Sequence, residues 1–347
     1  MDSIIPINMP KEREATWFEL ITLFAFLVFR NAKVDYGVFE TGMGGRLDAT
    51  NVLIPEISVI TPIELEHTEY LGDTIEKIAG EKAGIIKQGI PLVLGNQVPE
   101  ARQVFVSRCI EMQTKPYFID DYLEKMDFSL DLEQGKPVMN TKLQFTKETG
   151  FSRPLQTKMQ LIGEFQCRNA AVAALTIKLL FPEISEETIE KGLAKTSLPG
   201  RFELLHNEKE IPVVLDGAHT LNSLTFTLNT FYELYGKSSY FPHLLFACAA
   251  DKKVEEMSDR ILRSQNRFES ITLTRPGENK QSNLEELSTV FFNTSSDFNA
   301  DTKPIITVEQ DFKKAIKEAI TSAKKQGVPL LITGSFYLLA EVKKMYL

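Results

Sequence analysis

The sequence predicts an α/β protein with two domains, each built on a mostly parallel sheet. Short apolar runs alternate with helical stretches along most of the chain, which is the pattern of strands covered on both faces by helices. The length of 347 residues favours two domains, since one domain usually takes roughly 100–200 residues. Hydrophobic residues make up 43% and charged residues 25%, an ordinary globular composition that excludes disordered, collagen-like and coiled-coil chains.

The first predicted domain covers residues 1–197. Residues 15–30 are apolar nearly all round and contain no glycine or proline, which predicts a buried helix. Residues 34–40 predict a strand that runs into a glycine-rich turn at residues 41–46, and residues 57–61 predict a second strand. Because strand, polar loop and helix then repeat, we expect a parallel sheet here.

The remainder of this domain contains five more predicted features. A helix is predicted at residues 75–86 and a strand at residues 91–94. Residues 120–154 mix charges with short alternating stretches, which predicts a β-rich excursion of antiparallel strands. Two helices follow, at residues 164–180 and at residues 185–195, with Ser185 as the N-cap of the second.

The second predicted domain covers residues 198–347 and begins at the helix-breaking sequence Leu198-Pro199-Gly200. Its short apolar strands, separated by helical stretches, predict a parallel sheet at which ligands bind beyond the carboxyl ends of the strands. The predicted strands are residues 213–215, 244–247, 271–273, 305–307 and 330–333, and the loops that this rule selects are residues 216–219, 251–253 and 334–335.

Charge and cysteine content exclude several classes of protein. The 39 basic and 47 acidic residues give a net charge of −8, which argues against sequence-independent binding of nucleic acid. The most apolar run, residues 20–29, is far shorter than the roughly 20 residues of a membrane span, and residues 1–11 lack the pattern of a signal peptide. The three widely spaced cysteines indicate neither a disulfide framework nor a zinc site. A reducing cytoplasm therefore fits best, and we expect a monomer.

Polar side chains follow the predicted strands of the first domain. Glu40 ends a strand immediately before a glycine-rich turn, where a carboxylate can meet a magnesium ion; alone, it also fits a turn with an incidental acid. His67 lies among three glutamates whose negative field suits a cation; alone, it also fits a surface histidine. Lys82 taken alone fits a solvated helix face. None of these residues identifies a site by itself.

Together with further motifs, these residues resemble a known family. In its order and spacing, the chain is similar to the folylpolyglutamate synthase and dihydrofolate synthase family, which belongs with the Mur ligases to the ATP-dependent amide ligases. The matching strings are ETGMGGRLDATN (residues 40–51), VITPIELEHTEYLGDTIEKIAGEKAGIIKQGIPLV (59–93), GEFQCRNAAVAA (163–174), LPGRFE (198–203), VVLDGAH (213–219) and TGSFYLLAEV (333–342).

The resemblance implies a fold and a reaction. The implied fold is a truncated Mur-ligase-type central ATPase domain followed by a C-terminal Rossmann-like ligase domain. In the implied reaction, ATP phosphorylates the terminal carboxylate of a folate, and the amine of L-glutamate displaces phosphate from the acyl phosphate. Because two anions must meet, magnesium and cationic side chains are needed to offset their charge. ATP, folate and L-glutamate are thus the implied partners.

The resemblance assigns two groups of residues in the first domain. Glu40, His67 and Lys82 correspond to the magnesium site. The lysine at the position of Lys82 is carbamylated in these ligases, which gives it a catalytic role and makes chemical sense because a carbamate offers oxygens to a cation and an ammonium offers none. Phe18 and Asp48 resemble pterin contacts, one a ring to pack against and the other an acceptor for N–H donors.

A third group is implied to bind the nucleotide. Gln166 and Asn169 match residues that hold the adenine side of ATP. Arg201, Asp216 and His219 match residues that approach the nucleotide from the second domain, and His219 is also implied to be catalytic. Taken alone, the segment from Asp216 to His219 fits a strand-to-helix turn with an N-cap.

The chain departs from the family pattern in one chemically important respect. The family begins with a strand and a P-loop that holds the ATP phosphates, whereas the match here starts at about Thr16. The Gly-Lys-Ser at residues 236–238 lacks the glycine five residues earlier and follows a helical stretch instead of a strand. Smaller departures are Phe165, where the family usually has His, and Thr220-Leu221, where it usually has Asn-Pro.

Several interpretations therefore remain open. The chain is a fragment of an ordinary synthase, or it works with a separate N-terminal fragment, or it is a non-catalytic pseudoenzyme or binding protein. Within the superfamily, a dihydrofolate synthase or a muramyl-peptide ligase is the alternative. A Rossmann dehydrogenase is disfavoured because no G-x-G-x-x-G sequence opens a helix after a strand.

Overall fold

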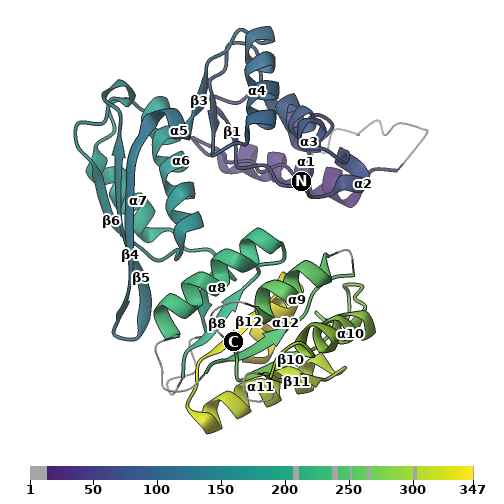
Figure 1. Cartoon of the computed structure of the whole chain (residues 1–347). Coiled ribbons are helices and arrows are strands. Elements are labelled where there is room, and N and C mark those ends of the chain that lie inside the picture. Colours follow the sequence, from purple (N-terminus) through teal and green to yellow (C-terminus); the bar gives the residue numbers. More distant parts are fainter. Residues whose placement is uncertain are drawn as a thin grey trace. The chain divides into compact units, whose positions relative to one another are not determined.

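The computed structural model describes residues 14–205, 211–236, 241–250, 252–263, 267–299 and 303–346. The features noted above at residues 1–11, Lys237, Ser238 and Asp251 lie outside these ranges. The described chain divides into two compact units (Figure 1). Unit 1 holds the residues up to Glu124 with Phe145–Phe151 and Ala171–Ile184, and unit 2 holds Lys125–Gln144, Ser152–Ala170 and the residues from Ser185 onward.

Unit 1 contains a parallel sheet of three strands in the order β1-β2-β3. Its core includes Ile78 from α3 and Phe105 from α4, both fully buried. Helix α3 starts at a cap in which Thr74 accepts a hydrogen bond from the Lys77 N–H, and Pro99 occupies the first turn of α4. The elements are α1 (Trp17–Ala32), η1 (Ala49–Val52), β1 (Ser58–Ile60), α2 (Thr68–Leu71), α3 (Ile75–Lys82), η2 (Ala83–Ile85), β2 (Leu92–Leu94), α4 (Pro99–Glu111), β3 (Pro116–Phe118), α5 (Ile119–Tyr122) and η3 (Lys147–Thr149).

Two predictions for the start of unit 1 are wrong. The segment at residues 34–40 forms no strand with any described residue, and its Val38 side chain is 95% exposed. An apolar run becomes a strand only when a neighbouring backbone pairs with it. Helix α1 does form, opened by a capping box between Thr16 and Glu19, but its single buried residue is Thr22. An apolar composition predicted burial, whereas the structure leaves most of the helix exposed.

Unit 2 opens with an antiparallel sheet of order β4-β5-β6. In the β5–β6 pair, Met139 lies opposite Met159 and Leu143 opposite Leu155, and all four side chains are buried. The antiparallel excursion expected at residues 120–154 is therefore present, and it extends through β6. The elements are β4 (Leu123–Glu133), β5 (Lys136–Phe145), β6 (Leu155–Met159), α6 (Glu164–Leu180), which begins in unit 2 and continues into unit 1, and α7 (Glu186–Lys195), capped by Ser185 as predicted.

The rest of unit 2 is a six-stranded sheet of order β11-β10-β9-β12-β8-β7, parallel except for the edge strand β7. The five strands predicted here are all present, and each is within one or two residues of its expected bounds. The elements are β7 (Glu203–Leu204), β8 (Val213–Asp216), α8 (Leu221–Tyr235), β9 (His243–Phe246), α9 (Val254–Leu262), β10 (Ser270–Leu273), α10 (Leu284–Ser295), β11 (Ile305–Val308), α11 (Phe312–Gln326), β12 (Leu330–Thr333) and α12 (Phe336–Tyr346).

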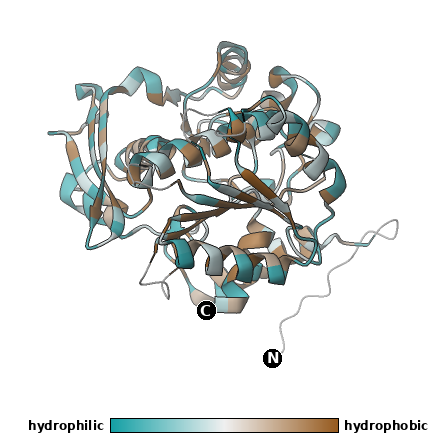
Figure 2. Ribbon diagram, turned by 60° about the horizontal axis from the view of Figure 1, so that its bottom comes forward, coloured by the Kyte–Doolittle hydropathy of each residue, from teal (hydrophilic) through white to brown (hydrophobic). Residues whose placement is uncertain are grey.

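Helices cover both faces of this sheet. Helices α11 and α12 share one buried cluster with β8, β9 and β12, and α8, α9 and α10 pack side by side on the other face (Figure 1). The strands of the sheet are apolar, whereas the helices alternate between apolar and polar residues (Figure 2). Because β12 lies between β8 and β9, the loops after these three strands meet at one edge of the sheet. Within the described ranges, no helix has both the length and the apolar character of a membrane span.

Candidate active site

A glycine turn in unit 1 joins the two residues expected to contact a pterin. The Asp48 carboxylate accepts hydrogen bonds from the N–H groups of Gly42 and Met43 at 2.8 and 3.0 Å. The Phe18 ring covers the same glycine, since a Cβ on Gly42 would lie 2.5 Å from Phe18 Cζ. Only glycine therefore allows the ring and the carboxylate to meet at this point of the backbone.

Asp48 also caps the short helix η1. Its second oxygen accepts hydrogen bonds from the N–H and the hydroxyl of Thr50 at 2.9 and 2.6 Å. Burial alone would raise the pKa of this carboxyl, but the hydrogen bonds from Thr50, Met43 and Gly42 outweigh it and lower the pKa below its ordinary value. Asp48 is thus an ionised residue that holds the turn together, and its role toward a pterin stays a prediction.

The same turn packs against the segments that carry the predicted metal ligands. A Cβ on Gly44 would lie 2.9 Å from Leu71, four residues after His67. A Cβ on Gly45 would lie 2.9 Å from the Glu81 carbonyl oxygen and 3.1 Å from that of Lys82. Since Glu40 precedes the turn directly, the turn gathers the segments of Glu40, His67 and Lys82.

An ion pair and two backbone contacts fix the turn to the end of α3. The Arg46 N–H donates to the Glu81 carbonyl oxygen at 2.8 Å, and the Arg46 guanidinium donates to the Glu81 carboxylate at 3.0 and 3.2 Å. Gly84 lies so close that a Cβ there would be 2.3 Å from Arg46 Cα. The Asn51 amide donates to the carbonyl oxygens of Arg46 and Gly84, both at 3.1 Å. The turn and the helix end therefore form one rigid element.

The donor set near the turn fits a hard cation only in part. Glu40 and His67 are exposed, and Lys82 is half-buried. The Glu40 carboxylate is the ligand type that magnesium prefers, whereas the Lys82 ammonium cannot coordinate a cation. No three acidic, histidine or cysteine side chains of the described residues gather into a metal site. Glu40 and His67 therefore suit a magnesium ion that takes further ligands from water, phosphate or a modified lysine.

The predicted adenine residues lie on the first turns of α6 in unit 2. The Asn169 amide donates to the Gln166 side-chain oxygen at 3.3 Å, and both residues are half-buried. Gly163, just before the helix, has φ +109 and leaves room for Thr230 of α8. The rings of Phe165 and Phe226 of α8 contact each other in a tilted arrangement, with 5.9 Å between centroids and 38° between planes. The Phe that replaces the usual His thus packs the start of α6 against α8.

Asp216 ends β8 with its carboxylate fully engaged. It accepts hydrogen bonds from the N–H groups of Phe202 and Ala218 at 2.8 and 2.9 Å and from the Thr227 hydroxyl at 2.9 Å. Burial raises the pKa of Asp216, and the hydrogen bonds and the charge of Arg201 offset part of that rise. Asp216 therefore ties the loop that carries Arg201 to the end of the sheet.

His219 lies three residues beyond the end of strand β8, just before α8. Its Nδ1 is 2.9 Å from the Gly217 carbonyl oxygen. Because a carbonyl can only accept, Nδ1 carries the proton in the neutral ring and Nε2 keeps a lone pair. Thr220 and Ser223 form a capping box, so the Thr that replaces the usual Asn also opens the helix.

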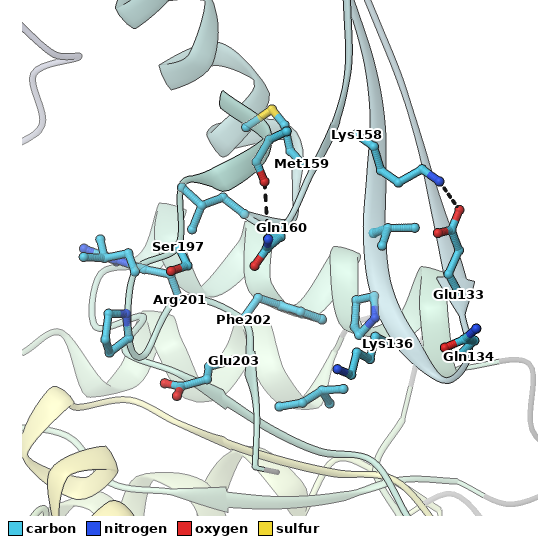
Figure 3. Close-up of a pocket in the computed structure, with 17 residues that line it drawn as sticks. Glu133, Gln134, Lys136, Lys158, Met159, Gln160, Ser197, Arg201, Phe202 and Glu203 are labelled. Atoms are coloured by element: carbon cyan, nitrogen blue, oxygen red, sulfur yellow. Dashed lines mark hydrogen bonds and ion pairs between the residues drawn. The ribbon is translucent and has the colours of Figure 1, made fainter. Parts of the chain in front are cut away.

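A cavity of about 690 Å³ lies beside the loop of Arg201 (Figure 3). In the close-up, Phe202 lies between Arg201 and Lys136 of β5, and the Glu133–Lys158 ion pair joins β4 to β6. Of the predicted site residues, Arg201 lines this cavity, and Gln166, Asn169, Asp216 and His219 do not. The cavity is thus not the place where the predicted nucleotide residues meet.

Three supporting residues had no predicted role. The sequence indicated for Glu81 only a place on a polar helix, and its ion pair with Arg46 was not predicted because the two residues are distant in sequence. Thr227 is a polar residue within the apolar face of a helix, a weak signal of a buried hydrogen bond. Phe202 has φ 47, which L residues rarely adopt and no local pattern announces.

Comparison with known proteins agrees with the architecture. The model of the Mur ligase middle domain matches residues 4–177, and that of the dihydrofolate synthetase C-terminal domain matches residues 201–345. The dihydrofolate synthase/folylpolyglutamate synthase of Bacillus subtilis is 32% identical over 336 residues, covering 95% of this chain and 72% of the relative. The folylpolyglutamate synthase of Lacticaseibacillus casei is 30% identical over 337 residues, covering 96% and 72%.

Solved structures show the same relation. A Mycobacterium tuberculosis folylpolyglutamate synthase complexed with ADP and AMPPCP superposes with a TM-score of 0.78 at 25% identity, over 95% of this chain and 72% of that one. A folylpolyglutamate synthase complex with AMPPCP and folate superposes with a TM-score of 0.71 at 28% identity, over 97% and 72%. The chain therefore belongs to the folylpolyglutamate synthase and dihydrofolate synthase family of the Mur ligase superfamily, a family of ATP-dependent ligases.

Proposed function

We propose that this chain carries most of the active site of a ligase that adds L-glutamate to a folate at the expense of ATP. The observation that carries the proposal is the glycine turn of unit 1. It joins Phe18 and Asp48 at Gly42 and packs against the segments that carry His67 and Lys82. A substrate carboxylate and a cation would thus meet at one element.

Unit 1 would hold the magnesium ion. Glu40 and His67 would be its protein ligands, and the ion would neutralise phosphate charge during transfer. The Lys82 ammonium can lose one proton to give the amine, and addition of the amine to carbon dioxide then gives a carbamate with release of a second proton. The carbamate oxygens would then complete a ligand set that an ammonium cannot join.

Unit 2 would hold the nucleotide and the incoming amine. Gln166 and Asn169 offer the amide donors and acceptors that an adenine edge requires. Arg201 brings a permanent positive charge toward a phosphate. Because Nδ1 of His219 is engaged with Gly217, the free Nε2 is the atom that would accept a proton from the amine of L-glutamate as it attacks the acyl phosphate.

The phosphates of ATP would need further binding groups. The sequence contains no G-x-x-x-x-G-K-[ST] stretch, the element whose backbone N–H groups and lysine hold phosphates in P-loop proteins. Charge-assisted hydrogen bonds contribute roughly 1.5–3 kcal/mol each, so without two of them ATP binds about a hundredfold or more weaker. A polypeptide of these 347 residues would thus bind Mg-ATP weakly and would not turn over alone.

A fusion experiment tests the proposal. The 347 residues are joined to the preceding segment of the Bacillus subtilis relative, and ADP release is measured with a panel of acceptors. Release that requires both L-glutamate and either a reduced folate or dihydropteroate supports the proposal, and the better acceptor identifies the substrate. Turnover of a UDP-muramyl substrate in place of a folate would contradict it.

The lysine has its own test in the same fusion. Lys82→Ala is expected to abolish turnover, and acetate is expected to restore part of it by supplying the missing carboxylate oxygens. Lys77→Ala is the matched control, because Lys77 lies on the same helix and pairs with the exposed Asp73. Equal turnover of Lys82→Ala and the unaltered fusion in buffer that contains bicarbonate would refute the carbamate.

A further inference from the structure

The ring of Phe336 lies where two predicted nucleotide residues converge. Phe336 begins α12 directly after the loop that follows β12, and it is 38% exposed. The Arg201 guanidinium carbon lies 4.8 Å from the centroid of the ring. The His219 ring approaches it edge-on, at 6.0 Å between centroids and 65° between planes. One side chain outside the predicted site therefore touches both Arg201 and His219.

The Phe336 ring lies so close to Gly217 and Gly200 that these two positions leave little or no space for a side chain. A Cβ on Gly217 would lie 2.4 Å from Phe336 Cε1 and Cζ. Gly200, with φ +73, would bring a Cβ to 3.2 Å from the same ring. The two glycines are hydrogen-bonded to each other, the Gly217 N–H donating to the Gly200 carbonyl oxygen at 2.8 Å. Phe336 therefore packs directly against two hydrogen-bonded glycines, Gly200 in the loop of Arg201 and Gly217 in the loop of His219.

The chemistry of this contact suits orientation of a cation. The face of an aromatic ring attracts a guanidinium through its quadrupole. This contact forms no hydrogen bond with the N–H donors, which point outward in the plane of the guanidinium. The donors of Arg201 consequently remain available for an anion. His219 is held from two sides, by the Gly217 carbonyl at Nδ1 and by the ring edge, which leaves its Nε2 lone pair unobstructed by these contacts.

We propose that Phe336 is a positioning residue, whose aromatic face orients Arg201 and His219 toward the nucleotide phosphates and the reacting amine. This inference rests on the proposed function of those two residues. A leucine at position 336 would fill similar apolar space without attracting the guanidinium. An aromatic side chain is accordingly required for orientation, and not only an apolar one for packing.

The first test needs no ligand. The unfolding equilibrium of the 347-residue chain is measured in urea for Phe336→Leu, Arg201→Met and the double variant. A cation–π contact predicts that the double variant loses less than the product of the two single losses, by a factor of about 2–5 in the equilibrium constant. Strict multiplication of the two single losses would overturn the orientation of Arg201 by the ring.

The second test uses Mg-ATP and a conservative variant. In the fusion with the Bacillus subtilis segment, Phe336→Leu is expected to raise the Kd for Mg-ATP about fivefold or more, and Phe336→Tyr is expected to keep the original Kd because it keeps the ring. In proton NMR, the ring-current shift of the His219 imidazole should vanish in the Leu variant and persist in the Tyr variant. Leu and Tyr variants that both match the unaltered chain would overturn the proposal.

The two tests separate this inference from the proposed function. If the fusion with the Bacillus subtilis segment shows no Mg-ATP binding at millimolar nucleotide, the nucleotide role of the site is refuted. The urea cycle and the His219 shift then still decide whether Phe336 orients the two side chains. A favourable coupling without nucleotide binding would support the orientation of Arg201 by Phe336 and contradict the proposed nucleotide role of the site.

Discussion

The Asp216 carboxylate accepts a 2.8 Å hydrogen bond from the N–H of Phe202, a residue in the left-handed backbone region with φ 47. Such a conformation costs energy for a residue with a side chain, and it persists only where neighbouring groups hold it. Asp216 is one of those groups, since it lies 14 positions away in sequence and is buried. The residue next to Phe202 is Arg201, so the buried carboxylate fixes the backbone that presents the guanidinium.

Thr227→Val tests this arrangement. The substitution keeps the shape of the side chain but removes the hydroxyl that donates to Asp216 at 2.9 Å. Leaving a buried carboxylate short of a donor costs about 1–3 kcal/mol of unfolding free energy. Thr176→Val is the control, because the Thr176 hydroxyl donates to the Val172 carbonyl within its own helix, and the substitution is expected to cost much less.

The pH dependence of that loss has a definite sign. Burial raises the pKa of Asp216, so this group stabilises the fold most below its unfolded pKa, and the contribution is lost as pH rises through the folded pKa. Removing the Thr227 hydroxyl raises that pKa further. The destabilisation measured by urea unfolding should therefore increase from about pH 4 to about pH 8. A loss that shrank with rising pH would contradict this.

Asp48→Asn should behave in the opposite way. Because hydrogen bonds lower the pKa of Asp48 below the ordinary 3.8, its contribution is fully present above that value and disappears as pH falls through the folded pKa. The unaltered chain should thus lose stability on acidification below about pH 4, and the variant should lose less. Asp73→Asn, at an exposed residue, is expected to have a small and salt-sensitive effect. Parallel acid curves for Asp48→Asn and the unaltered chain would refute the role of this carboxylate in the turn.

Gly84→Ala and Gly80→Ala form a matched pair at the end of α3. A Cβ on Gly84 would lie 2.3 Å from Arg46 Cα, whereas a Cβ on Gly80 meets nothing within 4 Å. Gly84→Ala should destabilise by about 1–3 kcal/mol through overpacking. Gly80→Ala should stabilise by about 0.4–1 kcal/mol, because alanine restricts the unfolded chain. Thermal unfolding distinguishes the two, and equal effects would mean that the turn is not docked on this helix.

Trp17 reports on the exposed face of α1. It is the sole tryptophan, is 76% exposed, and shares the helix with the exposed Phe24, Leu20 and Leu27. Contiguous apolar patches of this kind mark interaction surfaces. The emission of the isolated chain should resemble that of indole in water and be quenched by acrylamide.

The same fluorophore distinguishes what covers the helix. A blue shift on adding the preceding segment of the Bacillus subtilis relative would identify that segment as the cover. A blue shift that depends only on the concentration of the chain would identify a second copy. Emission that is already blue and unquenched in the dilute chain would contradict the exposed face.

Local pattern predicted many elements well. The helix α6 and the cap Ser185 follow the sequence closely, because caps and breakers act within a few residues. The strands of the C-terminal sheet were equally clear, since each is a short apolar run between polar loops. Long-range pairing was harder to predict, and residues 34–40 show why: an apolar run has no sequence signal for the presence or absence of a partner strand.

Sequence motifs suggested candidate site residues but not the contacts that support them. Motifs indicated Arg201, Asp216 and His219, yet nothing local indicates that Phe336 touches two of them. Contacts between residues more than a hundred positions apart depend on the fold of the whole sheet. The magnesium, nucleotide and pterin assignments remain predictions.

Transfer of oxygen-18 tests the central claim most directly. The fusion with the Bacillus subtilis segment is supplied with ATP, L-glutamate and a folate whose terminal carboxylate carries oxygen-18. If the carboxylate attacks the γ-phosphorus of ATP and the glutamate amine then displaces phosphate, one labelled oxygen leaves with the phosphate and the folate gains one glutamyl residue. Mass spectrometry of both products should show this. Glutamylated folate with unlabelled phosphate would contradict the acyl phosphate, and labelled phosphate without glutamylation would contradict the ligase.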